Sequence, residues 1–278
     1  MSRPPRRRRA ARLLLIPLCL LYSIPLIYLL IGSLKPPDEV LHGLSGFVPT
    51  SLTFDNYRAV FDSLSTSSTG YFWQFAAVSL TVSAMVVAGG LLVNSMAAYA
   101  LSRLRWPGRR AALAAVLLLM LVPFESVAVP LLYLFSDHRD TLYILVLPFI
   151  ANAFSIYQFH TYFRAIPRSV EESAVIDGAG PWRTLFGIVY PMSKPVFASV
   201  AILTFLVSWG SFLWPVLMIS DPSLRPLPLE MTVFQAQQPP DWGQILAFGV
   251  LLILPVLLVF LLFQRWVVRG VVTSVPRS

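Results

Sequence analysis

Long apolar runs alternate with shorter polar segments along almost the whole chain. Six of the runs approach or exceed the ~20 residues that a helix needs to cross the hydrocarbon core of a bilayer. We expect transmembrane helices over residues 13–31, 72–101, 111–135, 142–163, 196–219 and 245–263, and we expect Pro123 and Pro130 to break the third of them. The pattern therefore predicts an all-α integral membrane protein with six transmembrane helices.

The polar segments divide the chain further. We expect a basic tail over residues 1–12, an extracytoplasmic loop over 32–71 and a C-terminal tail over 265–278. Residues 72–264 form the core, which holds five of the helices and a polar loop over 164–195. The first apolar run has the charge order of a signal peptide, but no A-x-A cleavage site follows it, so we expect an uncleaved helix.

Composition supports a membrane protein. Hydrophobic residues make up 56% of the chain and charged residues 12%, whereas a soluble domain carries about 25% charged residues. The single cysteine, Cys19, excludes an intramolecular disulfide. No GxxxxGK[ST] sequence occurs, so the chain has no P-loop with which to cradle the phosphates of ATP.

The distribution of basic residues predicts the orientation. If the N-terminus is cytoplasmic, all but four of the 21 basic residues fall in cytoplasmic segments. The exceptions are Lys35, Arg58, Arg139 and Arg225. This bias satisfies the positive-inside rule with both termini in the cytoplasm. The loop over 164–195 is then cytoplasmic as well.

Signals within this loop predict two short helices. Pro167 ends the preceding helix, and Ser169 with Glu172 three residues later is typical of a capping box. Gly178 favours a helix stop, and Pro181 suits the first turn of a second helix. A helix of about two turns is unstable alone in water. The loop therefore needs a surface on which to dock.

The same loop resembles the EAA loop of ABC-importer permeases, written EAA-x3-G-x9-I-x-L-P. The matching residues are Glu172-Ser173-Ala174, Gly178, Ile188 and Pro191. Asp177-Gly178-Ala179 and Phe186 are similar to the carbohydrate-importer branch, as are the stretches Phe54–Tyr57 and Asn94–Arg110. The sequence departs from the pattern at Ser173, where Ala is usual, and at Tyr190, where Leu is usual.

The resemblance implies the type I ABC-importer permease fold and a bacterial cytoplasmic (inner) membrane location. It implies a subunit that forms half of the transmembrane pathway and couples ATP hydrolysis to uptake of a sugar or sugar derivative, without being an enzyme. The implied partners are a second, different permease, two ATPase subunits, an extracytoplasmic substrate-binding protein and membrane lipid, but no nucleic acid. We expect no cofactor on this chain, with ATP and Mg bound at the partner ATPase, and no metal site.

By the same resemblance, residues 169–178 are the coupling helix that sits in a groove of the ATPase. Small residues there permit close approach, and the glutamates offer carboxylates to basic groups of the partner. The predicted coupling residues are Ser169, Glu171, Glu172, Ser173, Ala174, Asp177, Gly178 and Ala179. The alternative is a helix that rests on lipid headgroups, which carboxylates suit poorly at an anionic leaflet.

A second set of residues is predicted to line the substrate pathway: Glu125, Asn152, Trp209, Ser211 and Trp214. Glu125 is the one acid at membrane depth, where a carboxylate is a functional hypothesis by default. It could bind a sugar hydroxyl, pair with the partner permease or lie at the external water boundary. The two tryptophans suit sugar rings, but Trp in a helix bundle is more often a packing residue or an interface anchor, and we expect Trp209 to line the interface between the permeases. Asn94, Asn152 and Gln158 are typical of interhelical hydrogen bonds.

Three other functions stay open at this point. The same architecture could carry a non-sugar cargo, such as a glycerophosphodiester or a peptide. A stand-alone secondary transporter would typically have internal repeats and paired intramembrane charges, whereas Glu125 stands alone. A membrane-embedded enzyme would need a cluster of catalytic polar residues at one membrane face, and the sequence has none.

Overall fold

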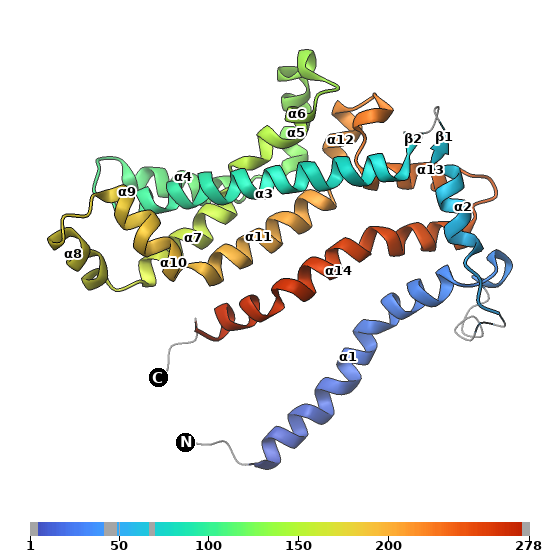
Figure 1. Cartoon of the computed structure of the whole chain (residues 1–278), viewed down its shortest axis with the longest axis horizontal. Helices are drawn as coiled ribbons and strands as arrows, with labels where there is room; N and C mark the ends of the chain where they lie inside the picture. Colours follow the sequence, from blue (N-terminus) through green and yellow to red (C-terminus); the bar gives the residue numbers. More distant parts are fainter. Residues whose placement is uncertain (1–4, 42–48, 50, 67–69, 274–278) are drawn as a thin grey trace. The chain divides into compact units, whose positions relative to one another are not determined.

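The structure, a computed structural model, describes residues 5–41, 49, 51–66 and 70–273 and is predominantly helical (Figure 1). The predicted all-α class is therefore confirmed, apart from one two-stranded hairpin. The chain divides into two compact units. The first comprises Met1–Phe72 and Glu230–Pro255, and the second comprises Trp73–Leu229 and Val256–Ser278.

Within the described residues, three helices are long and apolar enough to cross a membrane without interruption. They are α1 (Pro5–Ser33), α3 (Phe72–Ser102) and α14 (Trp242–Thr273). Helix α1 begins inside the segment expected to be a basic tail, and α14 continues into the expected C-terminal tail. Residues 1–4 and 274–278 of those tails lie outside the described residues.

Three further stretches meet the same criteria only as pairs of helices, because each pair is bent at a short break. Helices α4 (Arg109–Leu119) and α5 (Phe124–Leu134) are bent by 101°, and α6 (Leu142–Ile150) and α7 (Ala153–Ala165) by 41°. The stretch Pro181–Met192 and helix α11 (Lys194–Trp209) are bent by 79°. Counting each bent pair as one span gives up to six candidate spans.

The helix expected over 111–135 is interrupted before Phe124, as predicted, because Pro123 has no N–H to continue the ladder. The break expected at Pro130 is absent, since Pro130 lies inside α5. The helix expected over 196–219 ends at Trp209, and α12 (Leu213–Met218) starts after a break at Gly210–Phe212. Pro215 lacks the N–H that would pair with the Ser211 carbonyl, which favours an interruption at this point.

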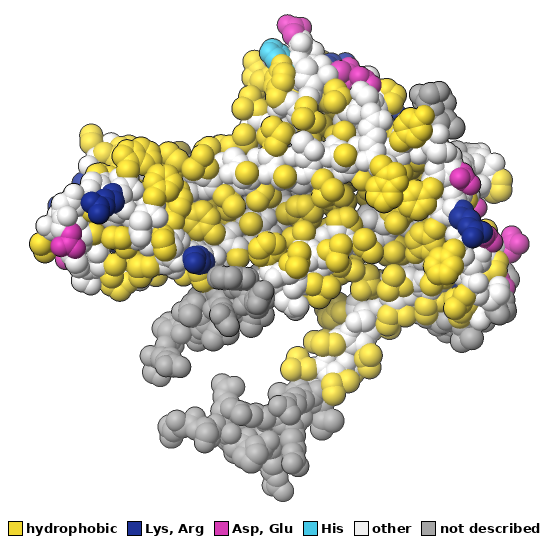
Figure 2. Space-filling view, viewed as in Figure 1, with side chains coloured by type: hydrophobic (Ala, Val, Ile, Leu, Met, Phe, Trp, Pro, Cys, Tyr) yellow, Lys and Arg dark blue, Asp and Glu magenta, His cyan; other side chains and the backbone are white. Residues whose placement is uncertain are grey.

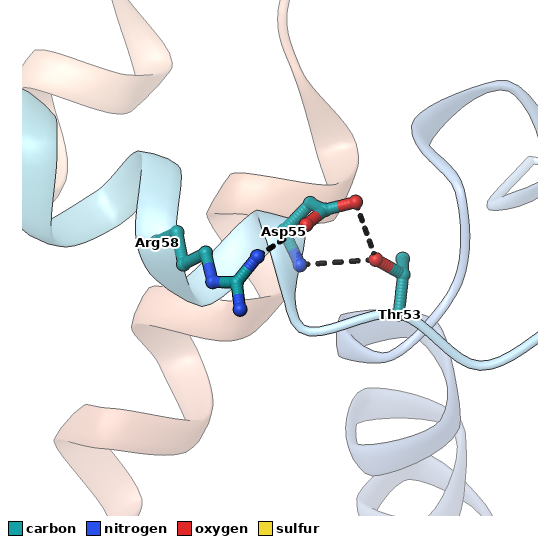
Figure 3. Close-up of polar contacts among 3 residues, drawn as sticks. All are labelled: Thr53, Asp55 and Arg58. Carbon is teal, nitrogen blue, oxygen red and sulfur yellow. Dashed lines mark hydrogen bonds and ion pairs between the residues drawn. The ribbon is translucent and has the colours of Figure 1, made fainter.

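In the first unit, helix α2 (Asp55–Ser63) is hydrogen-bonded to the end of α1. Thr53 fixes the start of α2, because its hydroxyl donates to the Asp55 carboxylate at 2.7 Å and accepts the Asp55 backbone N–H at 3.1 Å (Figure 3). Arg58 lies 3.4 Å from the same carboxylate on the exposed side of the helix (Figure 3). The local hydrogen bonds thus hold the family-like stretch Phe54–Tyr57 in a helical turn.

Asn56 is the buried polar residue of that turn. Its side-chain amide donates to the carbonyl oxygens of Ser33 and Lys35 at 2.9 and 2.7 Å, which satisfies groups left open at the end of α1. A side chain at Gly243, in the first turn of α14, would collide with Asn56. The absence of a side chain at Gly243 therefore lets α14 approach this amide.

Short elements complete the chain. Strands β1 (Ser65–Thr66) and β2 (Gly70–Tyr71) pair antiparallel, with Ser65 opposite Tyr71 and Thr66 opposite Gly70. The remaining helices are η1 (Pro37–Glu39), η3 (Ser136–His138), α8 (Arg168–Ile176), α9 (Pro181–Thr184), the π-helix η4 (Leu185–Val189), α10 (Tyr190–Met192), η5 (Pro222–Leu224), η6 (Leu227–Glu230) and α13 (Met231–Gln235). Residues 42–48, 50 and 67–69 of the expected extracytoplasmic loop lie outside the described residues.

Helix α3 contributes to two buried clusters of the second unit. One cluster, here the α3–α7–α11 core, contains Ala98, Tyr99, Phe159, Phe163, Ile166, Leu185, Val189, Val196 and Val200. The other, the α3–α6–α12 core, contains Val82, Val86, Ile144, Leu145, Val146, Trp214, Met218 and Ile219. On the face shown in Figure 2, charged side chains lie near the α8–α9 end and near the connection between α5 and α6, and hydrophobic side chains cover the helices between them.

Candidate functional site

The polar loop over 164–195 has two arms that differ in burial. The second arm enters the α3–α7–α11 core, where Leu185 and Val189 of η4 are 2% and 0% exposed. The first arm, α8, has Ala174 as its one buried residue. One arm therefore anchors the loop to the transmembrane helices, and the other presents a largely uncovered helix.

The turn between the arms forms as the sequence predicts. Gly178 has φ +78°, and a Schellman pattern surrounds it: Ala179 N–H donates to the Ala174 carbonyl at 2.9 Å, and Gly178 N–H to that of Val175 at 3.0 Å. Pro181 stands in the first turn of α9, as expected. The left-handed backbone at Gly178 explains why a glycine ends the helix there.

The predicted capping box is wrong. Helix α8 begins at Arg168, directly after Pro167, and no side chain caps its first turn. Ser169 lies inside the helix, where its carbonyl accepts a hydrogen bond from the Ser173 hydroxyl at 2.5 Å. Pro167 supplies the extended residue from which the helix starts, so Ser169 and Glu172 stand two positions too late to be a cap and its N3 partner.

Glu171 points into the protein. Its carboxylate oxygen lies 3.0 Å from Nε of Arg103, just beyond the end of α3, and the two side chains are 16% and 5% exposed. Burial raises the pKa of Glu171, while the nearby Arg103 and Arg168 lower it in part. Of the two glutamates that the sequence analysis offered to a partner, Glu171 is therefore engaged within the chain.

The exposed side of the loop carries both acids and apolar residues. Glu172, Ser173 and Asp177 are exposed, and so are Ser169 and Gly178. Sequence reasoning missed the apolar residues among them: Val175 and Ile176 are 63% and 86% exposed. Trp182 is 61% exposed and stacks on Phe186 at 6.0 Å between ring centroids. The signal was available, because apolar residues inside a polar loop indicate an interface.

A cavity of about 310 Å³ lies in the second unit, beside the breaks between α6 and α7 and between α11 and α12. Three aromatic residues, Phe149, Phe154 and Trp214, form part of its wall. Its polar lining consists of hydroxyl and amide groups, from Ser79, Asn152, Ser155, Gln158, Thr204, Ser208 and Ser211. Among the described lining residues there is no Asp, Glu, Lys or Arg.

The structure brings three of the five predicted pathway residues to this cavity: Asn152, Ser211 and Trp214. The other two lie elsewhere. Trp209 is 4% exposed and stacks on Phe205 at 5.7 Å, and Glu125 is exposed in the first turn of α5. The exposure of Glu125 favours the partner-facing or water-boundary alternatives over direct contact with cargo in this cavity.

Two cavity residues also hold the helices around it. The Trp214 indole N–H donates to the Ile144 carbonyl at 2.9 Å, and the Asn152 side chain caps α7 by accepting the Ser155 N–H at 3.0 Å. Sequence reasoning missed Thr204 and Ser208, and it assigned Gln158 to helix packing alone. The spacing of residues gave no signal for these side chains, because the cavity is lined by several segments that lie far apart in the sequence, from Ser79 to Pro226.

Comparison with known proteins decides the family. Residues 90–273 match the family described as binding-protein-dependent transport system inner membrane component. The chain belongs to this family. It is thus a permease subunit and a multi-pass inner membrane protein, as the EAA-like loop predicted.

Curated relatives of this permease cover nearly its whole length. It is 32% identical over 271 residues to the arabinooligosaccharides transport system permease protein AraQ of Bacillus subtilis (strain 168), covering 95% of this chain and 93% of the relative. It is 33% identical to the diacetylchitobiose uptake system permease protein NgcG of Streptomyces coelicolor, covering 93% and 85%. It is also 31% identical to the sn-glycerol-3-phosphate transport system permease protein UgpE of Pectobacterium atrosepticum, covering 85% and 86%.

The fold is also that of a solved transporter. A chain in the crystal structure of a bacterial ABC transporter involved in the import of the acidic polysaccharide alginate has a TM-score of 0.76 and 24% sequence identity to this permease. The match covers 95% of this chain and 98% of the other. The predicted ABC-importer permease fold is therefore confirmed.

The departure from the family pattern at Tyr190 has a local explanation. The Tyr190 hydroxyl lies 2.5 Å from that of Ser95 on α3, and its ring packs edge-on against Phe186 and Phe197. The larger side chain thus gains a hydrogen bond to the neighbouring helix. The departure at Ser173 is accommodated within α8, as its hydrogen bond to Ser169 shows.

Proposed function

We propose that this permease forms half of the pathway of an ABC importer for a neutral sugar or oligosaccharide. The observation that carries the proposal is the cavity, which combines hydroxyl and amide groups with aromatic rings and has no charged residue in the described part of its lining. Sugar hydroxyls pair with such polar groups, and the C–H faces of sugar rings pack on aromatic side chains. A buried anion without a positive partner would be strongly disfavoured.

The names of the relatives alone leave the charge of the cargo open. AraQ and NgcG are named for arabinooligosaccharides and diacetylchitobiose, whereas UgpE is named for sn-glycerol-3-phosphate. The lining of the cavity favours the first kind of cargo, because none of its described residues offers a guanidinium or ammonium group to a phosphate.

We further propose that α8 is the coupling helix and that it sits in a groove of a partner ATPase. Glu172, Val175 and Ile176 support this, because together they form an exposed patch with one carboxylate and two apolar side chains. Such a patch fits a groove with a basic rim and an apolar floor. ATP and Mg would bind at the partner, and this chain would transmit movement without covalent chemistry.

The proposed assembly contains a second, different permease, two ATPase subunits and an extracytoplasmic binding protein. Both termini and the loop over 164–195 would face the cytoplasm, as the basic residues predict. Glu125 would then lie toward the partner permease or the external boundary.

The test starts with purification of the tagged chain from its own membranes in mild detergent, with partners identified by mass. We expect an ATPase and a second permease, whose complex is then reconstituted with its binding protein to measure uptake of neutral oligosaccharides and of glycerol phosphate. Ser208→Phe, which fills the cavity, should lower neutral sugar uptake by at least about tenfold. The matched control is Leu206→Phe on the same helix, at a residue 36% exposed and outside the lining.

Recovery of the chain alone, repeatedly, would contradict the importer and favour a stand-alone transporter. Uptake of glycerol phosphate but of no neutral sugar would overturn the proposed cargo and leave the importer standing. Equal uptake by Ser208→Phe and Leu206→Phe would remove the cavity from the pathway.

A further inference from the structure

We propose that α3 and α7 move as one rigid body that links the coupling helix α8 to the cavity, and that Arg103 is the positioning residue at which α8 is attached to it. This inference rests on the proposed coupling role of α8. It concerns the path inside the chain by which a movement of α8 reaches the cavity.

Arg103 makes one anchor, at the cytoplasmic end predicted for α3. Its terminal nitrogen donates to the backbone carbonyls of Phe163 and Ile166, the latter at 2.6 Å, and its Nε pairs with Glu171. The carbonyls belong to the end of α7 and the connection to α8, and the carboxylate belongs to α8 itself. A single guanidinium thus joins three consecutive parts of the chain.

Asn94 makes a second anchor at the opposite end of α7. Its amide donates to the Ile150 carbonyl at 3.0 Å, and its oxygen accepts the Asn152 N–H at 2.9 Å. These are the backbone groups that the break between α6 and α7 leaves open, next to the cavity lined by Asn152. Asn94 is 1% exposed, so loss of these bonds would leave buried polar groups unpaired.

The two anchors prevent sliding of α7 along α3. Nine residues separate Asn94 from Arg103, which is about 13.5 Å at the ~1.5 Å rise of an α-helix. Between the anchors, Tyr99 of α3 and Phe159 and Phe163 of α7 belong to the same buried core. Close-packed side chains transmit displacement instead of absorbing it. A shift at the Arg103 end therefore appears at the Asn94 end.

Helix α8 depends on Arg103 for its attachment. With Ala174 as its one buried residue, α8 has little apolar packing to hold it against the transmembrane helices. The ion pair with Glu171, whose side chain is 16% exposed against 5% for Arg103, is its main polar link to the end of α3. Contiguous packed and hydrogen-bonded networks of this kind carry energetic coupling between distant sites.

The experiment compares Arg103→Gln, Arg103→Lys and Glu171→Gln in the intact transporter, reconstituted with its partner subunits. Arg105→Gln is the matched control, because Arg105 is an exposed arginine in the same connection between α3 and α4. We expect Arg103→Gln to lower the sugar moved per ATP hydrolysed by about tenfold, with smaller losses in the two conservative variants and none in the control. Unchanged coupling in Arg103→Gln would overturn the proposal. Failure of all three variants to assemble would also overturn it, by making Arg103 a folding residue.

A distance measurement tests the rigid body without reference to cargo. The native cysteine is replaced by Cys19→Ser, and spin labels are attached at Leu92→Cys on α3 and Arg168→Cys in the first turn of α8. Both sites are exposed and lie outside the patch of Glu172, Val175 and Ile176. We expect one narrow distance that is the same with and without ATP, and a broadened distance in Arg103→Gln. A distance that changes with ATP in the unmutated background would contradict the rigid link. If the transporter moved no sugar, the proposed function would fail while this measurement still decided the link.

Discussion

Single polar side chains hold the places where the helices of this permease are interrupted. Asn94 spans one break, and Asp140 fixes the segment that follows α12. The Asp140 carboxylate accepts the backbone N–H groups of Ser220 and Asp221 at 2.5 and 2.8 Å, and its own N–H donates to the Met218 carbonyl at 3.0 Å. Its backbone has φ 53°, a conformation that Asp tolerates better than most residues.

We predict that Asp140→Ala releases this segment and that Asp140→Asn does so less. Alanine removes the one carboxylate oxygen that accepts both N–H groups and is disfavoured at positive φ, whereas asparagine keeps one oxygen and the conformation. Amide hydrogen exchange of the peptide containing Ser220 and Asp221 should become faster in Asp140→Ala, while a peptide from α6 stays unchanged. Unaltered exchange at Ser220 and Asp221 would show that the carboxylate does not hold the segment.

The same contacts set the pH dependence with which Asp140 stabilises the segment after α12. The N–H groups of Asp221 and Ser220 lower the pKa of Asp140 below its ordinary value. A lowered pKa means that the folded state favours the carboxylate. Its contribution is therefore present above the unfolded-state pKa and is lost as the pH falls through the lowered value. In the unmutated chain, the two amides should accordingly stay protected from exchange near neutral pH. They should lose the protection that Asp140 provides only when the pH falls through its lowered pKa.

At the scale of elements, the sequence predicted the helix ends that a single residue determines. It did not predict the features that depend on tertiary contacts. Gly178 and Pro181 gave the turn of the coupling loop, because a left-handed glycine and an N-terminal proline act locally. The break at Gly210–Phe212 was missed, because hydropathy is continuous across residues 196–219. The ion pair of Glu171 was missed because its partner Arg103 is far away in the sequence.

Gly178 supplies the element-scale prediction. A Cβ there would meet none of the described residues within 4 Å, so a side chain at this position would point into space available to a partner. We predict that Gly178→Asn, which tolerates positive φ, inserts and assembles but lowers sugar uptake relative to ATP hydrolysis. Gly178→Val should be worse, since a β-branched residue adds backbone strain of roughly 1–2 kcal/mol.

The control for the Gly178 variants is Gly187→Asn in η4, on the anchored arm, where an added Cβ also meets nothing within 4 Å. Uptake and ATP hydrolysis are measured together in proteoliposomes. Fully coupled uptake by Gly178→Asn would show that the turn needs the glycine for its backbone alone, and that no partner surface approaches it.

At the scale of the whole molecule, the family and the fold class were predictable because the EAA-like pattern and the hydropathy are both local signals. The cavity was not, since its lining joins Ser79, Gln158 and Ser208, which no spacing rule connects. Within the described residues, three unbroken helices are long and apolar enough to cross a membrane, and three pairs of helices meet the same criteria only with a bend. Orientation depends on a different signal, the placement of charge.

That signal yields the last prediction, on the topology of the chain in its membrane. In a Cys19→Ser background, Asp137→Cys places a thiol in η3 and Ile176→Cys places one on α8, and both native residues are exposed. All but four basic residues fall on the side of α8 in the predicted layout, and positive segments stay in the cytoplasm. A membrane-impermeant maleimide should therefore label Asp137→Cys in whole cells and Ile176→Cys in inside-out vesicles.

Labelling of Ile176→Cys should rise when the ATPase is stripped away, because the groove then no longer covers α8. Labelling of both thiols from the same side would refute the six-span orientation, and with it the access of α8 to cytoplasmic ATPases.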